Sequence, residues 1–160
     1  VLMSFRDNDI NTFKTLVHPT EGLIFSYDGH VDPDDVKMTI TEIEEHLQKN
    51  DEILWGLGDG SGLPVKNTLA DRFKMYSKID YLSAPQNAYN KVLTNGNTNI
   101  DTVYAGKPFL SFYLPPTDTY TDENGKEVIQ PNSWKAINLV FDMYNNKPFL
   151  IGVVTDNWTI

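Results

Sequence analysis

The stretch that decides the fold covers residues 134–160 and reads WKAINLVFDMYNNKPFLIGVVTDNWTI. Its first part alternates between apolar and polar residues, so that Ile137, Leu139 and Phe141 share one face. An alternation of period two predicts a β-strand. Residues 145–147 are of types that tolerate positive φ, and a nearly continuous β-rich apolar run follows them. We therefore expect a β-hairpin that enters the core of the protein.

The chain ends in Trp158-Thr159-Ile160, which adds two large apolar side chains after the hairpin. Because such side chains are expensive to leave in water, we expect the terminal residues to be packed. Deletion of these three residues is then expected to destabilise the domain.

Length and composition predict one globular domain over residues 1–160, because no Ser/Gly-rich or charge-block linker divides the chain. No apolar run approaches the roughly 20 residues that a transmembrane helix needs. The formal charge is −9, from 22 acidic and 13 basic residues, and the lysines are scattered among carboxylates. This pattern argues against nucleic acid and anionic lipid as partners, since both require clustered Lys and Arg.

The chain contains no cysteine, which excludes a disulfide framework, a zinc–thiolate site and a thiol nucleophile. A cysteine-free domain suits a cytosol, or the exterior of a bacterium that builds secreted domains without disulfides. The first four residues lack the basic, apolar and small-residue progression of a signal peptide. We expect any export signal to have been removed. Separately, the sequence leads us to predict no cofactor.

Helix N-caps and strand patterns divide the chain into an early helical part and a late β part. The predicted caps are Asn8 or Asp9 before residues 10–17, Thr39 or Thr41 before residues 40–48, and Thr68 before residues 69–76. Strands are expected at residues 22–27, 53–55 and 108–114. Residues 79–102 are expected to be irregular, and residues 117–132 to form a long polar excursion with an Asn124-Gly125 turn.

This order predicts an α+β domain in which N-terminal helices pack on a bent antiparallel sheet. The layout resembles the cone-shaped nuclear transport factor fold, which often holds a pocket between helix and sheet. A shared layout does not fix a function.

The most glycine-dense segment, residues 56–64, follows Trp55 and contains Asp59 and Ser61. It lacks the Gly-Lys-Ser/Thr ending of a phosphate loop, and Asp59 stands where a nucleophile elbow needs glycine. One interpretation is a tight turn in which Asp59 bonds its own backbone. The other is a loop that contacts a ligand.

The three histidines, His18, His30 and His46, share no metal-ligand spacing, so we predict no metal site. His18 stands at a predicted helix end, where it could accept a proton from a ligand. The acidic loop at residues 28–35 clusters carboxylates but lacks the ligand pattern of an EF-hand. Solvated loop charge is the simpler interpretation, and calcium binding stays undecided.

Aromatic residues could line a pocket together with Arg72, which is one of two arginines in the chain. An isolated arginine beside aromatic rings can clamp a carboxylate. Alternatively, the rings belong to the core and Arg72 pairs with a neighbouring acid. The aromatic residues are Tyr27, Trp55, Phe73, Tyr76 and Tyr81, and the candidate ligand-binding residues are His18, Tyr27, Trp55, Asp59, Ser61 and Arg72.

Four stretches carry a resemblance to a known family. They are HPTEGLIFSY at residues 18–27, WGLGDGSGLP at 55–64, GNT at 96–98, and the ending from Trp134 through LVF at 139–141 to WTI at 158–160. With these stretches the chain resembles, over nearly its whole length, a family of uncharacterised bacterial surface lipoprotein domains. The resemblance implies an exported domain tethered through a lipid on an upstream cysteine, and it implies no activity. Residues 117–132 depart from the family, which tends to be short there.

Three functions follow from these observations. The first is a non-catalytic extracellular domain that binds a small ligand or a cell-envelope partner through a pocket around Trp55, Asp59 and Arg72. The second is a cone-fold enzyme that acts on a small molecule with His18 or Asp59 as general base, which requires a desolvated cleft and a perturbed pKa. The third is a structural or adhesive spacer. The first is the function we predict.

Overall fold

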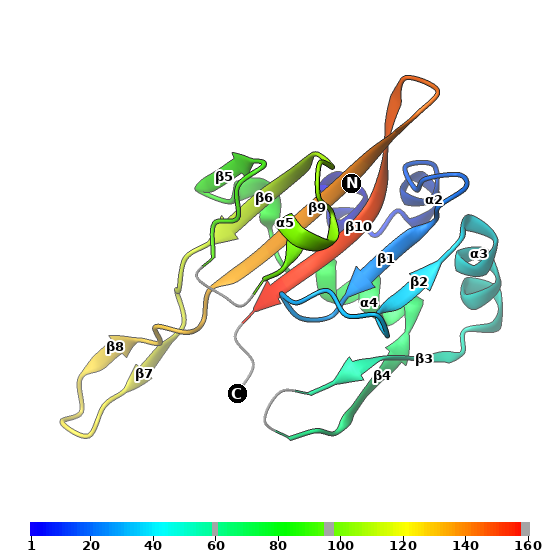
Figure 1. Ribbon diagram of the computed structural model, residues 1–160. Coiled ribbons are helices and arrows are strands. Elements are labelled where there is room, and N and C mark those ends of the chain that lie inside the picture. Colours follow the sequence, from blue (N-terminus) through cyan, green and yellow to red (C-terminus); the bar gives the residue numbers. More distant parts are fainter. Residues whose placement is uncertain (59–60, 95–97, 158–160) are drawn as a thin grey trace.

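A six-stranded mixed sheet organises the computed structural model, which describes residues 1–58, 61–94 and 98–157 (Figure 1). The strand order is β2-β1-β10-β9-β6-β5. The strands are β1 (Leu23–Ser26), β2 (Val36–Met38), β5 (Gln86–Tyr89), β6 (Phe109–Leu114), β9 (Lys135–Tyr144) and β10 (Lys147–Asn157). All neighbours are antiparallel except β1 and β10, which run parallel. The prediction of an antiparallel sheet is therefore wrong for the pair β1–β10.

The predicted terminal hairpin is confirmed as the pair β9–β10 at the centre of the sheet. Asn145 and Asn146 form the two-residue turn with φ of 48° and 61°. Positive φ at both positions matches the right-handed twist of the flanking strands. A register shift between Leu150 and Gly152 marks a bulge, which bends β10. The prediction for Trp158-Thr159-Ile160 lies outside the described residues.

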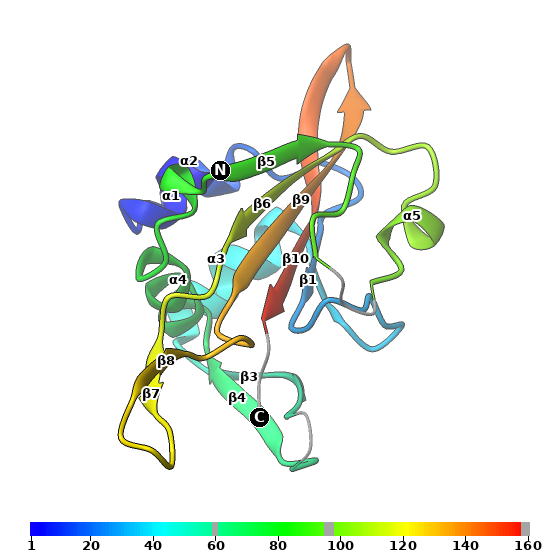
Figure 2. The same cartoon turned by 90° about the vertical axis from the view of Figure 1, so that its left-hand side faces the viewer.

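Four helices cover one face of the sheet, whereas the short helix α5 (Ile100–Val103) lies on the opposite face (Figure 2). The four are α1 (Leu2–Arg6), α2 (Ile10–Lys14), α3 (Ile40–Lys49) and α4 (Leu69–Ser77). The cap predictions are confirmed for α2, α3 and α4, where side chains of Asp9, Thr39 and Thr68 accept backbone N–H groups. The α+β class is thus observed, with helices packed on a bent mixed sheet.

Alternation along the strands divides the core between the two faces of the sheet. On β9, Ile137 and Leu139 join the cluster under the helices, while Val140 joins the cluster on the α5 side. The helix-side cluster is rich in aromatic rings, with Phe13 and Phe73 in edge contact at 4.8 Å between centroids. Helix α4 packs onto the sheet through this cluster.

Residues 79–102 are not irregular throughout, so that prediction is wrong. They contain a 3-10 helix η1 (Tyr81–Ser83), the edge strand β5 and the start of α5. The sequence of β5 is Gln-Asn-Ala-Tyr, which shows no apolar alternation, and three of its four residues are exposed. Pairing with β6 rather than local pattern makes this segment a strand.

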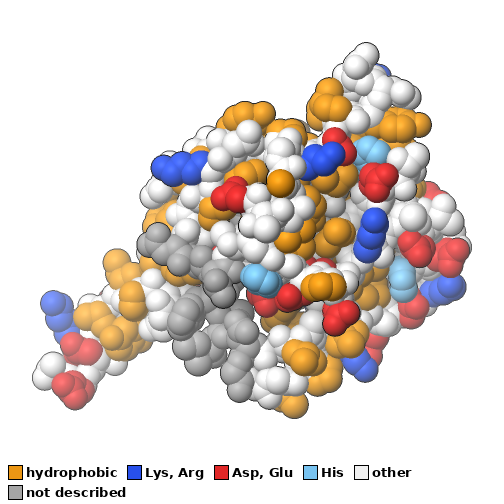
Figure 3. Space-filling model, viewed as in Figure 1, with side chains coloured by type: hydrophobic (Ala, Val, Ile, Leu, Met, Phe, Trp, Pro, Cys, Tyr) orange, Lys and Arg blue, Asp and Glu red, His pale blue; other side chains and the backbone are white. Residues whose placement is uncertain are grey.

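Two further hairpins stand outside the main sheet. Strands β3 (Glu52–Leu57) and β4 (Pro64–Thr68) pair with each other, as do β7 (Thr119–Thr121) and β8 (Glu127–Ile129). The polar excursion of residues 117–132 is thus an arm, and Figure 3 shows hydrophobic side chains on it. Tyr120 and Ile129 are exposed there. Within the described ranges, none of the helices is long and apolar enough to cross a membrane.

Candidate ligand-binding pocket

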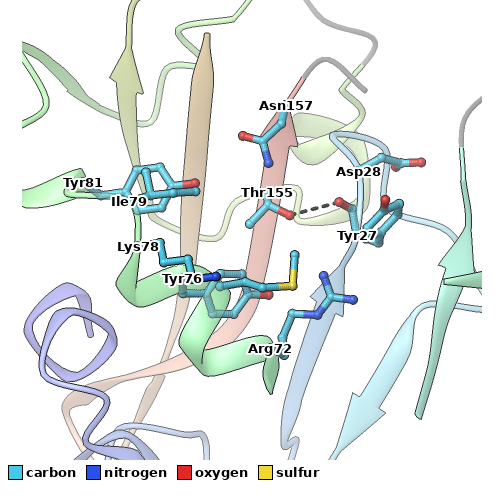
Figure 4. Close-up of a pocket in the computed structure, with 10 residues that line it drawn as sticks. Tyr27, Asp28, Arg72, Tyr76, Lys78, Ile79, Tyr81, Thr155 and Asn157 are labelled. Carbon is cyan, nitrogen blue, oxygen red and sulfur yellow. Dashed lines mark hydrogen bonds between the residues drawn. The ribbon is translucent and has the colours of Figure 1, made fainter. Parts of the chain in front are cut away.

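A cavity of about 330 Å³ opens between α4 and the helix-facing side of β10 (Figure 4). Its wall combines the end of β1, one face of α4, the segment that follows α4, and the end of β10. The lining residues are Tyr27 and Asp28, Arg72, Met75 and Tyr76, Lys78, Ile79 and Tyr81, and Thr155 and Asn157. Segments separated by more than a hundred residues in the chain therefore meet at this cavity.

Local structure explains why these side chains converge. The Thr68 side chain accepts the Asp71 N–H at 3.1 Å and fixes the start of α4. Arg72 and Tyr76 are then one turn apart and share a helix face. Across the cavity, Thr155 Oγ1 donates to the Tyr27 carbonyl at 3.0 Å, which ties the end of β1 to β10. One wall is thus fixed by a local hydrogen bond and the other by a hydrogen bond between segments far apart in the chain.

Arg72 is the most unusual group in the pocket, because its side chain is 3% exposed and carries a charge. Its guanidinium carbon lies 4.4 Å from the centroid of the Trp55 ring and 5.3 Å from that of Tyr27. Its Nε and Nη2 atoms are buried and have no hydrogen-bond partner in the described part of the chain. The neighbouring acid, Asp71, pairs with Lys74 instead. The alternative in which Arg72 pairs with a neighbouring acid is therefore wrong for the described residues.

A buried cation without an anion is energetically unfavourable, since buried charges are normally paired and hydrogen-bonded. Stacking on Trp55 and Tyr27 offsets part of the penalty. Burial lowers the pKa of the Arg72 guanidinium, but arginine stays charged in proteins. The guanidinium therefore keeps unused hydrogen-bond donors that suit an anionic group.

Two phenols in the wall also stay protonated. Burial raises the pKa of Tyr76 to about 12, even though the nearby charge of Arg72 acts in the opposite direction. Burial also raises the pKa of Tyr81. Both hydroxyl groups are therefore hydrogen-bond donors at neutral pH.

Three of the six candidate residues come together at this site. Tyr27 and Arg72 line the cavity, and Trp55 supports the guanidinium from the core side. Trp55 is itself buried, with its indole N–H donating to the Asn67 carbonyl at 3.0 Å and its ring in edge contact with Phe25. Its role is to hold Arg72 rather than to form the wall.

His18, also a candidate ligand-binding residue, lies apart from this cavity. Its side chain is 4% exposed, and Nδ1 accepts the Glu21 N–H at 3.0 Å. The ring packs against Tyr144 and Phe149 at the turn end of the β9–β10 hairpin. Because its backbone N–H donates to the Leu150 carbonyl, His18 is fixed beside β10.

Ser61 is also outside the pocket. It is exposed in the β3–β4 turn, where its hydroxyl donates to the Gly58 carbonyl and accepts the Leu63 N–H, both at 3.3 Å. Ser61 therefore takes part in the turn through local hydrogen bonds. Asp59 lies outside the described residues.

Sequence reasoning missed the pocket residues that carry little pattern of their own. Lys78 follows the last turn of α4, and Thr155 and Asn157 continue the alternation of β10 onto its helix-facing side. That alternation was the available signal, because polar residues at core-facing positions of a strand point to a wet or occupied site. Tyr76 and Tyr81 line the cavity and also belong to the helix-side core cluster, together with Trp55 and Phe73.

In the acidic loop before β2, local hydrogen bonds hold the carboxylate of Asp35. Asp35 accepts hydrogen bonds from Ser26 Oγ at 2.5 Å and from the Asp32 N–H at 2.9 Å. Burial, its largest influence, raises the pKa of Asp35. Across the described residues, no three His, Cys, Asp or Glu side chains are arranged to hold a metal ion.

Comparison with known proteins adds little to this geometry. No protein-family model and no curated protein matches the chain. Among solved structures, the chain is similar to a designed protein titled Rd1NTF2_05, in a variant with five substitutions. The identity is 13% over 96% of this chain and 88% of that chain, with a TM-score of 0.34. No ligand or activity follows from a likeness at this level.

Proposed function

We propose that the protein is a non-catalytic binding domain that holds a small organic carboxylate in the pocket between α4 and β10. The observation that supports this proposal is the buried guanidinium of Arg72, which has no anionic partner among the described residues. A planar guanidinium matches a carboxylate in geometry and charge.

The charge distribution supports an anion rather than a neutral ligand. The chain as a whole carries −9, yet the pocket wall contains two cationic side chains, Arg72 and Lys78, and one acidic side chain, Asp28. A positive site in an acidic protein favours anions locally while the overall charge keeps the protein soluble. The tyrosines and Ile79 give the ligand body an apolar or aromatic surface to contact.

The place of action is part of the same proposal. The resemblance of four sequence stretches to bacterial surface lipoprotein domains implies an exported protein at the cell surface, and the lack of cysteine fits a domain built without disulfides. A cell-surface binding domain would meet small carboxylates, free or as part of a cell-envelope component. His18, which the enzyme hypothesis names as a general base, lies away from the cavity.

Binding can be tested by isothermal titration calorimetry with 3-phenylpropanoate and its neutral analogue 3-phenylpropanamide. We expect the acid to bind and the amide to bind at least tenfold more weakly. The variant Arg72→Met, which keeps an unbranched side chain, is expected to lose the binding of the acid.

The matched control is Arg6→Met, which removes the other arginine of the chain. Arg6 is exposed and pairs with Asp7 at 2.7 Å, so its replacement should leave the affinity unchanged. Equal affinity for acid and amide, or full affinity in Arg72→Met, would contradict the proposed function.

A further inference from the structure

We infer that the ligand carries a hydroxyl group at the end opposite its carboxylate, held between Tyr81 and Asn157. This inference rests on the proposed function and names the ligand class more closely: a hydroxy-carboxylate with an apolar or aromatic body.

Two polar atoms of the pocket other than those of Arg72 are buried without a partner. They are the Tyr81 hydroxyl and Asn157 Oδ1, and neither forms a hydrogen bond within the described chain. Tyr81 is buried, and it belongs to the wall of the cavity. In Figure 4 the Tyr81 hydroxyl points toward the β10 wall, where Thr155 and Asn157 lie. Unpaired buried groups are rare in native proteins, and two from separate elements converge here.

The chemistry of the two atoms selects the missing group. The Tyr81 hydroxyl donates, because burial keeps the phenol protonated, and the Asn157 carbonyl oxygen only accepts. A ligand hydroxyl can accept from the first and donate to the second at the same time. A carboxylate cannot donate, and a methyl group can do neither. The hydroxyl therefore satisfies both atoms with one ligand group.

The position of the two ends sets the ligand length. Arg72 stands in the first half of α4 and Tyr81 in η1, beyond the end of that helix at Ser77. The helical rise from Arg72 to Ser77 alone is about 7.5 Å, so we choose a probe whose carboxylate and hydroxyl stand more than one helical turn apart. An acid chain of two methylene groups on a para-hydroxyphenyl ring has a comparable length. The probe is 3-(4-hydroxyphenyl)propanoate, and 3-phenylpropanoate is its partner without the hydroxyl.

Tyr104 provides a matched control on the opposite face of the sheet. Its hydroxyl is also buried and unpaired, but it lies over Gly152 and outside the pocket wall. Replacing either tyrosine by phenylalanine removes one hydroxyl and keeps the ring. A difference between the two variants therefore reports on the pocket and not on the loss of a buried hydroxyl.

The measurement is the ratio of the two dissociation constants by calorimetry. We expect the wild-type protein to bind 3-(4-hydroxyphenyl)propanoate about tenfold more tightly than 3-phenylpropanoate. In Tyr81→Phe the ratio should fall to about one or two. In Tyr104→Phe it should stay at the wild-type value. Asn157→Leu, which removes the acceptor at similar volume, should also reduce the ratio.

The outcomes separate this inference from the proposed function. If both acids bind equally well to the wild-type protein and Arg72→Met abolishes both, the inference is overturned and the carboxylate site stands. If the preference for the hydroxylated acid survives in both Tyr81→Phe and Asn157→Leu, the assignment of these two residues is overturned. If neither acid binds, the proposed function fails and the inference fails with it.

Discussion

Replacing Arg72 by methionine should stabilise the ligand-free protein while it abolishes binding. Arg72 is 3% exposed, and two of its side-chain nitrogens have no partner in the described part of the structure. A residue kept for packing alone would show the opposite behaviour. The sign of the stability change therefore distinguishes a binding residue from a structural one.

The magnitude follows from three contributions. Each unpaired buried polar group costs about 1–3 kcal/mol, and the substitution relieves two of them. It loses the stacking of the cation on Trp55 and Tyr27, which contributes about 1–2 kcal/mol at a desolvated site. A methionine sulfur against the same rings restores about 0.3–1.5 kcal/mol. Together these contributions give a gain in the free energy of unfolding of about 3 kcal/mol, within a range of roughly 0.3 to 6.5 kcal/mol.

The assay is chemical denaturation of both proteins without ligand, complemented by thermal melting. For a chain of this size, each 1 kcal/mol corresponds to a melting-temperature change of about 2–4 °C. Arg6→Met, at an exposed position, should stay within about 0.5 kcal/mol of the wild type. A loss of stability of 1 kcal/mol or more in Arg72→Met would refute the reasoning, because the cation would then be a net stabilising part of the folded state.

Two further predictions concern the fold. Burial raises the pKa of Asp156, whose carboxylate accepts from Thr94 Oγ1, so this group stabilises the protein below its unfolded pKa and loses that contribution as pH rises through the folded pKa. The free energy of unfolding of Asp156→Asn relative to the wild type should therefore increase from acid to neutral pH, and a difference that does not change with pH in urea denaturation would contradict the assignment. Gly22 has φ of 72°, and a Cβ there would stand 2.5 Å from the Met38 carbonyl oxygen, whereas a Cβ at Gly106, φ 76°, would meet no atom within 4 Å. Gly106→Ala should cost about 1–2 kcal/mol from backbone strain alone, and Gly22→Ala about 1–3 kcal/mol more, since the strand partner must shift; equal losses in the two variants would rule out the clash.

The elements that the sequence predicts are those whose signals are local. Asp9, Thr39 and Thr68 begin α2, α3 and α4 as expected, because a cap side chain bonds to its own helix and needs no other part of the chain. The β9–β10 hairpin is likewise encoded by alternation and by two residues that tolerate positive φ. Strand β5 is not predicted by any local pattern, because its residues are polar and its pairing with β6 makes it a strand.

The sequence by itself determined the α+β class, the caps, the central hairpin, and the presence of an arginine among aromatic residues. Only the tertiary structure decided what that arginine does. Whether Arg72 has an acid beside it, and whether Tyr81 and Asn157 face the same cavity, depends on contacts between segments far apart in the chain. Periodicity reports which face of an element is buried, but it carries no information on which buried polar groups are left without a partner. The pocket therefore depends on the packing of α4 against β10, which no local pattern encodes.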